Sequence, residues 1–203
     1  MTIPFYIVDV FTEKKYAGNQ LAVFFNAQDL STEQMQEITR EINFAESTFV
    51  TAVDVENNQA AVRIFTPASE MQFAGHPVIG TSWVILNKVF DHGTKAITLN
   101  VPIGPIPVKE INDQLWLKAA QPVFFDVFRK EDFASFSNLK TTDFDSRFVV
   151  QEVSTGSAFV IVPLQSKEAL DAIELDKEKT ASWLTANCKT QHKTKFCILE
   201  CCA

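Results

Sequence analysis

Residues 62–82 constrain the fold of this chain most strongly, because a β-type run there gives way abruptly to an apolar helix. The β-type residues end at Thr66-Pro67, a pair typical of a turn. Gly75-His76-Pro77 then begins a long apolar segment. Proline is tolerated in a first helical turn because the amide hydrogen that it lacks would have no partner there. We therefore predict a helix over about 77–89, buried because its apolar residues occupy nearly every side.

The first turn of that helix is a candidate binding site. His76 lies there beside free backbone N–H groups, at the positive end of the helix dipole, where an anion can be held. Gly75 would let a substrate approach the backbone closely, and Pro77 belongs to the same turn. Taken alone, His76 fits equally well as a donor or proton relay and as a residue that only caps or packs the helix.

Three further polar positions are candidates. Glu46 precedes the apolar strand predicted over 46–53, where a partly buried carboxyl group could both take and give a proton. An exposed glutamate at a strand end is the simpler interpretation of that position. Gly18-Asn19 forms a predicted turn, in which the Asn19 amide is either a turn residue or a substrate contact. Glu70 is expected to be a solvated charge.

Elsewhere the pattern alternates short strands with few helices. A helix is predicted from Ser31 or Thr32 to about Asn43, with Met35, Ile38 and Ile42 on its apolar face. Gly80, inside the buried helix, indicates tight packing. Residues 123–146 show poor periodicity and are expected to form a connection with a short helix. The remaining predicted strands are 3–11, 21–25, 60–66, 96–101, 106–111, 114–119, 147–153, 157–163 and 195–202, and the remaining helices 166–173 and 177–187.

The second half of the chain repeats the first loosely. The segment 18–25 (GNQLAVFF) is echoed by 156–162 (GSAFVIV), and ESTFVTAV at 46–53 is echoed by KFCILECC at 195–202. No counterpart of the 62–82 element follows the second copy, so the repeat predicts one full half and an unfinished one.

Composition excludes several classes of function. The net charge of −7 and the lack of a basic stripe argue against nucleic acid as a partner. No secretory signal or membrane-spanning apolar run is visible, and no glycine-rich phosphate loop, HExxH or GxSxG motif occurs. The four cysteines, none of them in a CxxC pair, are expected to be reduced in a cytoplasmic protein, with no metal site.

Several motifs, in order, resemble those of one family. They are Asp9-Val10-Phe11, residues 18–23 (GNQLAV), residues 41–50 (EINFAESTFV), residues 63–67 (RIFTP) with Glu70, residues 73–77 (FAGHP) with Gly80-Thr81, and Ser154-Thr155-Gly156. This combination resembles the phenazine-biosynthesis PhzF-like proteins, cofactor-independent isomerases related in fold to diaminopimelate epimerase. The resemblance covers the whole chain.

The resemblance implies an α+β, diaminopimelate-epimerase-like fold, with two pseudo-symmetric β-barrel-like halves each around a central helix. Residues 1–120 would form the first half, with its central helix at about 77–89. Residues 121–203 would form a partial second half without its central helix. Because an Arg-x-Phe-x-Pro stretch and its following aspartate are missing, we expect a truncated, weakly active form or rescue by another chain.

The resemblance also assigns roles to the candidate residues. Glu46 and His76 would be catalytic, with Glu46 moving a proton on a small carboxylated substrate, and Gly75, Pro77, Gly18 and Asn19 would bind that substrate. No cofactor is implied, and a homodimer is a possible assembly. Ala45 stands where the family usually has serine, which removes one possible substrate contact. The alternatives are a non-catalytic small-molecule binding or interaction protein with the same fold, and a hydrolase or lyase that uses Glu46 as its base.

Overall fold

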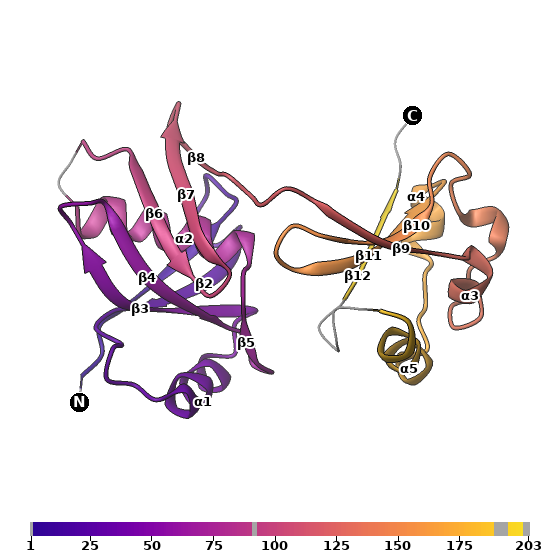
Figure 1. The fold of residues 1–203 in the computed structure, drawn as a ribbon, viewed down its shortest axis with the longest axis horizontal. Coiled ribbons are helices and arrows are strands. Elements are labelled where there is room, and N and C mark those ends of the chain that lie inside the picture. Colours follow the sequence, from indigo (N-terminus) through magenta and orange to yellow (C-terminus); the bar gives the residue numbers. More distant parts are fainter. Residues whose placement is uncertain (1, 91–92, 189–194, 201–203) are drawn as a thin grey trace. The chain divides into compact units, whose positions relative to one another are not determined.

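The computed structural model describes residues 2–90, 93–188 and 195–200, and the chain divides after Ala119 into two compact units (Figure 1). The first unit contains β1 (Phe5–Val10), β2 (Asn19–Phe24), α1 (Thr32–Ile42), β3 (Glu46–Asp54), β4 (Gln59–Phe65), β5 (Glu70–Met71), α2 (Gly75–Lys88), β6 (Ala96–Val101), β7 (Gly104–Ile111) and β8 (Gln114–Leu117). The second contains β9 (Val123–Phe128), α3 (Lys130–Ala134), the 3₁₀ turn η1 (Thr141–Asp143), β10 (Val150–Ser154), β11 (Ala158–Leu164), α4 (Lys167–Asp171), α5 (Lys177–Asn187) and β12 (Lys195–Glu200).

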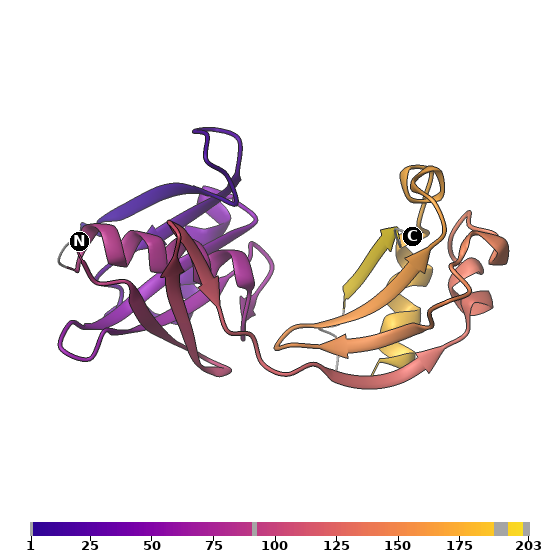
Figure 2. The same ribbon diagram turned by 90° about the horizontal axis from the view of Figure 1, so that it is seen from above.

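The first unit is a mixed, strongly curved sheet with one helix inside the curve and one outside it (Figures 1 and 2). Its strands follow the order β1-β2-β3-β4-β6-β7-β8, and β5 pairs with β4. The pairs β2/β3 and β4/β6 are parallel, and the other pairs are antiparallel. Parallel neighbours need a crossover connection, and here α1 and α2 supply the two crossovers. The chain therefore has the α+β fold predicted from its sequence.

Helix α2 forms the centre of the main core. Its buried residues Val78, Val84 and Ile85 pack against a continuous apolar lining of the sheet. That lining comes from six strands and includes Val10, Leu21, Val23, Val50, Val62, Ile64, Leu99 and Val108. The predicted buried helix is confirmed with one correction. Trp83 is 46% exposed, because the sheet leaves one side of α2 open.

Helix α1 packs against the other face of the sheet. Its predicted start is confirmed by a capping box, in which Ser31 Oγ accepts from the Gln34 N–H and Gln34 Oε1 accepts from the Ser31 N–H. The helix ends at Asn43, whose φ of 57° lies in the left-handed region. Met35, Ile38 and Ile42 contact the cluster that contains Phe24, Phe49 and Phe65, so the predicted apolar face is also confirmed.

The second unit is a four-stranded sheet in the order β12-β11-β10-β9. A cluster that includes Phe133, Val160, Val162 and Trp183 packs one face of the sheet against its helices. Strands β10 and β11 are antiparallel, and β12 follows α4 and α5 to pair parallel with β11. The same strand-strand-helix-strand order occurs in β1, β2, α1 and β3, which confirms the internal repeat.

One predicted element is wrong. Residues 123–128 were expected within a connection, but they form strand β9, which pairs antiparallel with β10. Its sequence, VFFDVF, is apolar at every position except Asp126, so β9 shows little alternation between apolar and polar residues. Val123, Phe124 and Val127 are all more than half exposed. Alternation is the signal by which a strand is recognised in a sequence. The expected short helix is present as α3, Lys130–Ala134.

Candidate active site

Glu46 is the first residue of β3, opposite Leu21 of the neighbouring parallel strand β2. The left-handed turn at Asn43 ends α1 and returns the chain to the sheet, which places this carboxylate where the strand begins. Its side chain is 19% exposed, so the carboxylate is largely enclosed while remaining accessible from outside.

His76 is the second residue of α2, and its side chain is 7% exposed. Ala74 precedes the helix in an extended conformation, and no side chain caps this end. The first intrahelical bond of this turn runs from the Val78 N–H to the Ala74 carbonyl at 3.3 Å. The N–H groups of Gly75 and His76 therefore have no partner within the helix, and Pro77 has no N–H to satisfy.

The two residues meet directly. His76 Nδ1 lies 2.9 Å from Glu46 Oε2. This contact joins the start of β3 to the first turn of α2. The second ring nitrogen, Nε2, is buried and has no hydrogen-bond partner among the described residues. A neutral imidazole that donates from Nδ1 to a carboxylate keeps an acceptor at Nε2. A buried polar atom without a partner costs stability, so this nitrogen is a contact that a bound molecule or water could satisfy.

Packing below the pair fixes its geometry. Thr48 lies two residues after Glu46 on β3, and its Oγ1 is 2.8 Å from Oγ1 of Thr81 on α2. Both threonines are fully buried. At Gly80 the helix touches the sheet so closely that an added Cβ would lie 2.6 Å from Leu21 Cδ2 and 2.7 Å from Val10 Cγ2. The tight packing predicted at Gly80 is confirmed.

The predicted substrate-binding glycines have different surroundings. A Cβ at Gly75 would meet only Leu117 Cδ2 among the described atoms, at 3.9 Å, so there is space beside the backbone there. A Cβ at Gly18 would lie 2.5 Å from the Val10 carbonyl oxygen, which is a structural reason for glycine. Asn19 begins β2, pairs with Val10 and is exposed. No described contact joins Asn19 to Glu46 or His76.

Glu70 is not the free solvated charge that the sequence suggested. Its carboxylate accepts from Arg63 Nε at 2.7 Å and from Arg63 Nη2 at 2.8 Å, which is a bidentate pair between β4 and β5. These hydrogen bonds raise the pKa of the Arg63 guanidinium. Arg63 also donates to Thr32 Oγ1 at 2.9 Å. The pair thus fastens the segment leading to His76 against the start of α1.

Three residues near the site were missed by the sequence reasoning. Thr48 and Thr81 hold β3 to α2, and the phenyl ring of Phe11 has its centroid 6.3 Å from that of the His76 ring. Two signals could have revealed the threonines: Thr48 shares a strand face with Glu46, and Thr81 is a hydroxyl within an apolar helix. Phe11 gave no such signal, because it was expected within the strand 3–11, where an aromatic residue is ordinarily part of the core.

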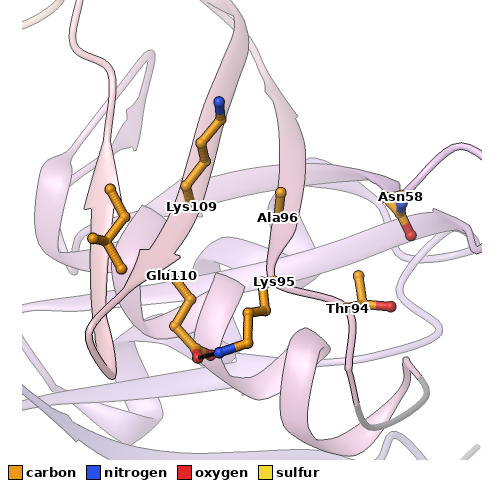
Figure 3. A pocket seen from close by; sticks show the side chains of 7 residues that line it. Asn58, Thr94, Lys95, Ala96, Lys109 and Glu110 are labelled. Atoms are coloured by element: carbon orange, nitrogen blue, oxygen red, sulfur yellow. Dashed lines mark hydrogen bonds and ion pairs between the residues drawn. The ribbon is translucent and has the colours of Figure 1, made fainter.

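A hollow lies elsewhere on the first unit, away from Glu46 and His76. It has a volume of about 450 Å³ and is lined by Asn58, Thr94, Lys95, Ala96, Lys109, Glu110 and Ile111 (Figure 3). Lys95 and Glu110 form an ion pair across it at 3.0 Å. It is an open depression between surface side chains and contains neither Glu46 nor His76, so we do not assign the chemistry to it.

Within residues 2–90, 93–188 and 195–200, no group of three or more His, Cys, Asp or Glu side chains could hold a metal ion. No helix in the same part of the chain is long and apolar enough to cross a membrane.

Known proteins match both the sequence and the fold. The family model for phenazine biosynthesis-like proteins matches residues 8–200. A trans-2,3-dihydro-3-hydroxyanthranilate isomerase of Pseudomonas aeruginosa is 31% identical over 187 residues, which cover 90% of this chain and 65% of that protein. The match covers 65% of that relative and of two further isomerases of the same name, so the chain spans less than two thirds of their length.

Solved structures show the same fold. A PhzF-family phenazine biosynthesis protein of Bacillus anthracis matches with a TM-score of 0.77 at 24% identity, covering 100% of this chain and 69% of that one. A hydroxyproline epimerase of Agrobacterium vitis matches with a TM-score of 0.52 at 8% identity, covering 79% of this chain and 51% of that one. The fold is therefore the epimerase-like one expected from the sequence.

Proposed function

Because this chain belongs to the phenazine biosynthesis-like protein family, we propose that it acts as an isomerase of the PhzF type, moving a proton on a small carboxylated substrate. The family match and the named isomerases among its relatives support this proposal. The observation that carries it is the 2.9 Å contact between Glu46 and His76 at the open end of a buried helix.

The proposed reaction uses Glu46 as both base and acid. Its carboxylate removes a proton from one substrate carbon, and the resulting carboxylic acid returns that proton to another carbon. A double bond shifts in the opposite sense, so atoms and electrons balance and the substrate is isomerised without any external reactant. A carboxylate that is mostly enclosed yet reachable suits this role, because water competes less for the proton.

His76 and the helix end would orient the substrate. The 2.9 Å contact with His76 Nδ1 would hold the Glu46 carboxylate in place, and Nε2 is left for a polar group of the substrate. The unpartnered N–H groups of Gly75 and His76 suit a substrate carboxylate, since a helix N-terminus favours negative charge. The homodimer and the cytoplasmic location stay predictions.

The test is proton exchange with solvent. The full chain is incubated in D₂O with trans-2,3-dihydro-3-hydroxyanthranilate, the compound named for the relative from Pseudomonas aeruginosa, and deuterium in the recovered compound is measured by mass spectrometry. We expect incorporation by the wild type and a loss of about 10³-fold in Glu46→Gln, since removing a general base typically costs 10²–10⁴-fold.

Glu110→Gln is the matched control, because Glu110 is also a partly buried, ion-paired glutamate, 26% exposed and 3.0 Å from Lys95. It should exchange at the wild-type rate. A wild type that binds the compound without exchanging its protons would instead indicate the alternative function, a binding protein with the same fold.

A further inference from the structure

Phe11 has an unusual backbone conformation and exposure for an aromatic residue. Its φ is 62°, in the left-handed region that bulky side chains rarely adopt, and its side chain is 74% exposed. Such strain persists only where the surrounding structure imposes it, and it gathers at binding and catalytic sites. Core packing does not explain the conformation, because a ring that is three-quarters exposed buries little apolar area.

The loop between β1 and β2 imposes this conformation through several contacts. The Tyr16 N–H donates to Asp9 Oδ2 at 2.7 Å, which closes the loop on itself. The Lys14 N–H donates to Thr12 Oγ1 at 3.0 Å. Gly18 lies so close to Val10 and Thr12 that any side chain there would force the loop open. Phe11 is therefore held in place by its neighbours rather than by burial of its own ring.

The held ring lies beside the proposed active site. The centroids of the Phe11 and His76 rings are 6.3 Å apart, and the ring planes are tilted by 50°. One flank of the histidine is thus lined by an exposed aromatic side chain, while its Nε2 lacks a described partner. An apolar surface next to a few convergent polar groups is the usual composition of a small-molecule site.

We propose that Phe11 is a specificity-determining residue of the Glu46–His76 site, and that its ring forms the wall against which a flat part of the substrate lies. Aromatic rings pair favourably with other flat, polarisable rings in offset or edge-to-face arrangements. They stabilise a flexible aliphatic chain much less. The site therefore selects a carboxylate borne on an unsaturated ring over an acyclic one. This inference rests on the proposed function for the position of the substrate.

Tyr16 supplies a matched control within the same loop. It shares the left-handed conformation, with φ of 66°, and is 93% exposed, but no ring contact joins it to His76. Glycine adopts the left-handed conformation without strain, so replacing either aromatic residue by glycine removes backbone strain. Neither change should therefore lower the melting temperature. Only Phe11→Gly should alter binding.

The experiment is a calorimetric titration of the full chain with two probes, 3-hydroxyanthranilate as the ring-borne carboxylate and 3-hydroxybutyrate as the acyclic one. We expect the wild type to prefer the ring compound. Phe11→Gly should lower the affinity for the ring compound by about tenfold, which corresponds to the loss of one aromatic pair. It should change the affinity for the acyclic acid by less than about twofold. Tyr16→Gly should bind both probes as the wild type does.

Equal affinity of the wild type for both probes, or unchanged binding in Phe11→Gly, would overturn the role of Phe11. If Phe11→Gly bound both probes more weakly by the same factor, or if it alone had a lower melting temperature, Phe11 would have a structural role. Either result would also overturn the proposed role in specificity. These titrations need no turnover. Failure of the deuterium exchange assay would therefore remove the proposed function without deciding the role of Phe11, and the reverse also holds.

Discussion

Each unit of this chain contains a mostly buried carboxylate paired with a basic side chain, and the two pairs are built differently. In the first unit, Glu46 on β3 meets His76 on α2 through one 2.9 Å contact, thirty residues apart in sequence. In the second unit, Asp145 is 5% exposed and accepts from Arg147, two residues away, through its backbone N–H and its guanidinium. One pair joins two elements of the fold, and the other closes a local turn.

The difference separates a pair suited to chemistry from a structural one. Arginine stays protonated at any physiological pH, so the Asp145–Arg147 pair has no proton to exchange. An imidazole that contacts a carboxylate through one nitrogen keeps a second nitrogen for another partner. The Glu46–His76 contact therefore leaves a buried nitrogen, His76 Nε2, without a described partner, whereas the bonds from Arg147 occupy both oxygens of Asp145.

Beyond loss of the carboxylate itself, the largest effect should come from removing the basic partner of Glu46, and removing the basic partner of Asp145 should have almost none. His76→Asn keeps a donor near the position of Nδ1 but removes Nε2, so we expect deuterium exchange to fall by about 10²-fold. Arg147→Gln removes the basic partner of the other pair and should leave exchange within about twofold of wild type. Similar losses in both variants would show that the contrast between the pairs has no functional meaning.

The next effect concerns how the long-range pair is held. Thr81→Val leaves the buried Thr48 hydroxyl without its partner, which should cost about 1–3 kcal/mol of stability, measured by urea unfolding. Thr48→Val combined with Thr81→Val removes both polar groups and should recover part of that loss. If the double variant is as unstable as the sum of the two single variants, the hydrogen bond is not the cause.

The smallest effect should appear in acid. The hydrogen bonds from Arg147 hold the pKa of Asp145 below its usual value of 3.8. A carboxylate whose folded pKa lies below its unfolded pKa stabilises the fold above the unfolded value, and this contribution is lost as the pH falls through the folded pKa. Asp145→Asn lacks the contribution, so its melting temperature should lie below that of wild type at pH 7.

The acid series tests the sign of that contribution. Melting temperatures of wild type and Asp145→Asn are measured from pH 7 downward, and the gap between them should shrink below about pH 4. A gap that widens in acid would contradict the proposed role of the Arg147 hydrogen bonds.

Much of the fold could be predicted because its signals are local. Ser31 and Asn43 mark the two ends of α1, and Gly75-His76-Pro77 marks the start of α2. The alternation of apolar and polar residues predicted most strands, while β9 was missed because its sequence, VFFDVF, does not alternate. Trp83 was expected inside, since nothing in its own helix shows on which side the sheet is open.

The site was less predictable because its contacts join distant residues. The sequence indicated Glu46 and His76 separately as candidate residues, but their separation in the sequence did not indicate that they would touch. Their meeting depends on the sheet order β2-β3-β4 and on the crossover through α2. The Glu70–Arg63 pair depends likewise on the reversal between β4 and β5. Only the family resemblance placed Glu46 and His76 in one site, and it gave no role to Phe11.

The contact at Gly80 has a consequence for redesign of this protein. A side chain there would require the side chains of Leu21 and Val10, or α2 itself, to shift, and His76 would move with its helix in the second case. An engineer who wishes to alter what the site accepts therefore has unequal freedom around it. Position 80 accepts a side chain only if its neighbours shift, whereas position 11, on an exposed loop outside the core, can be varied while the carboxylate and the imidazole keep their distance.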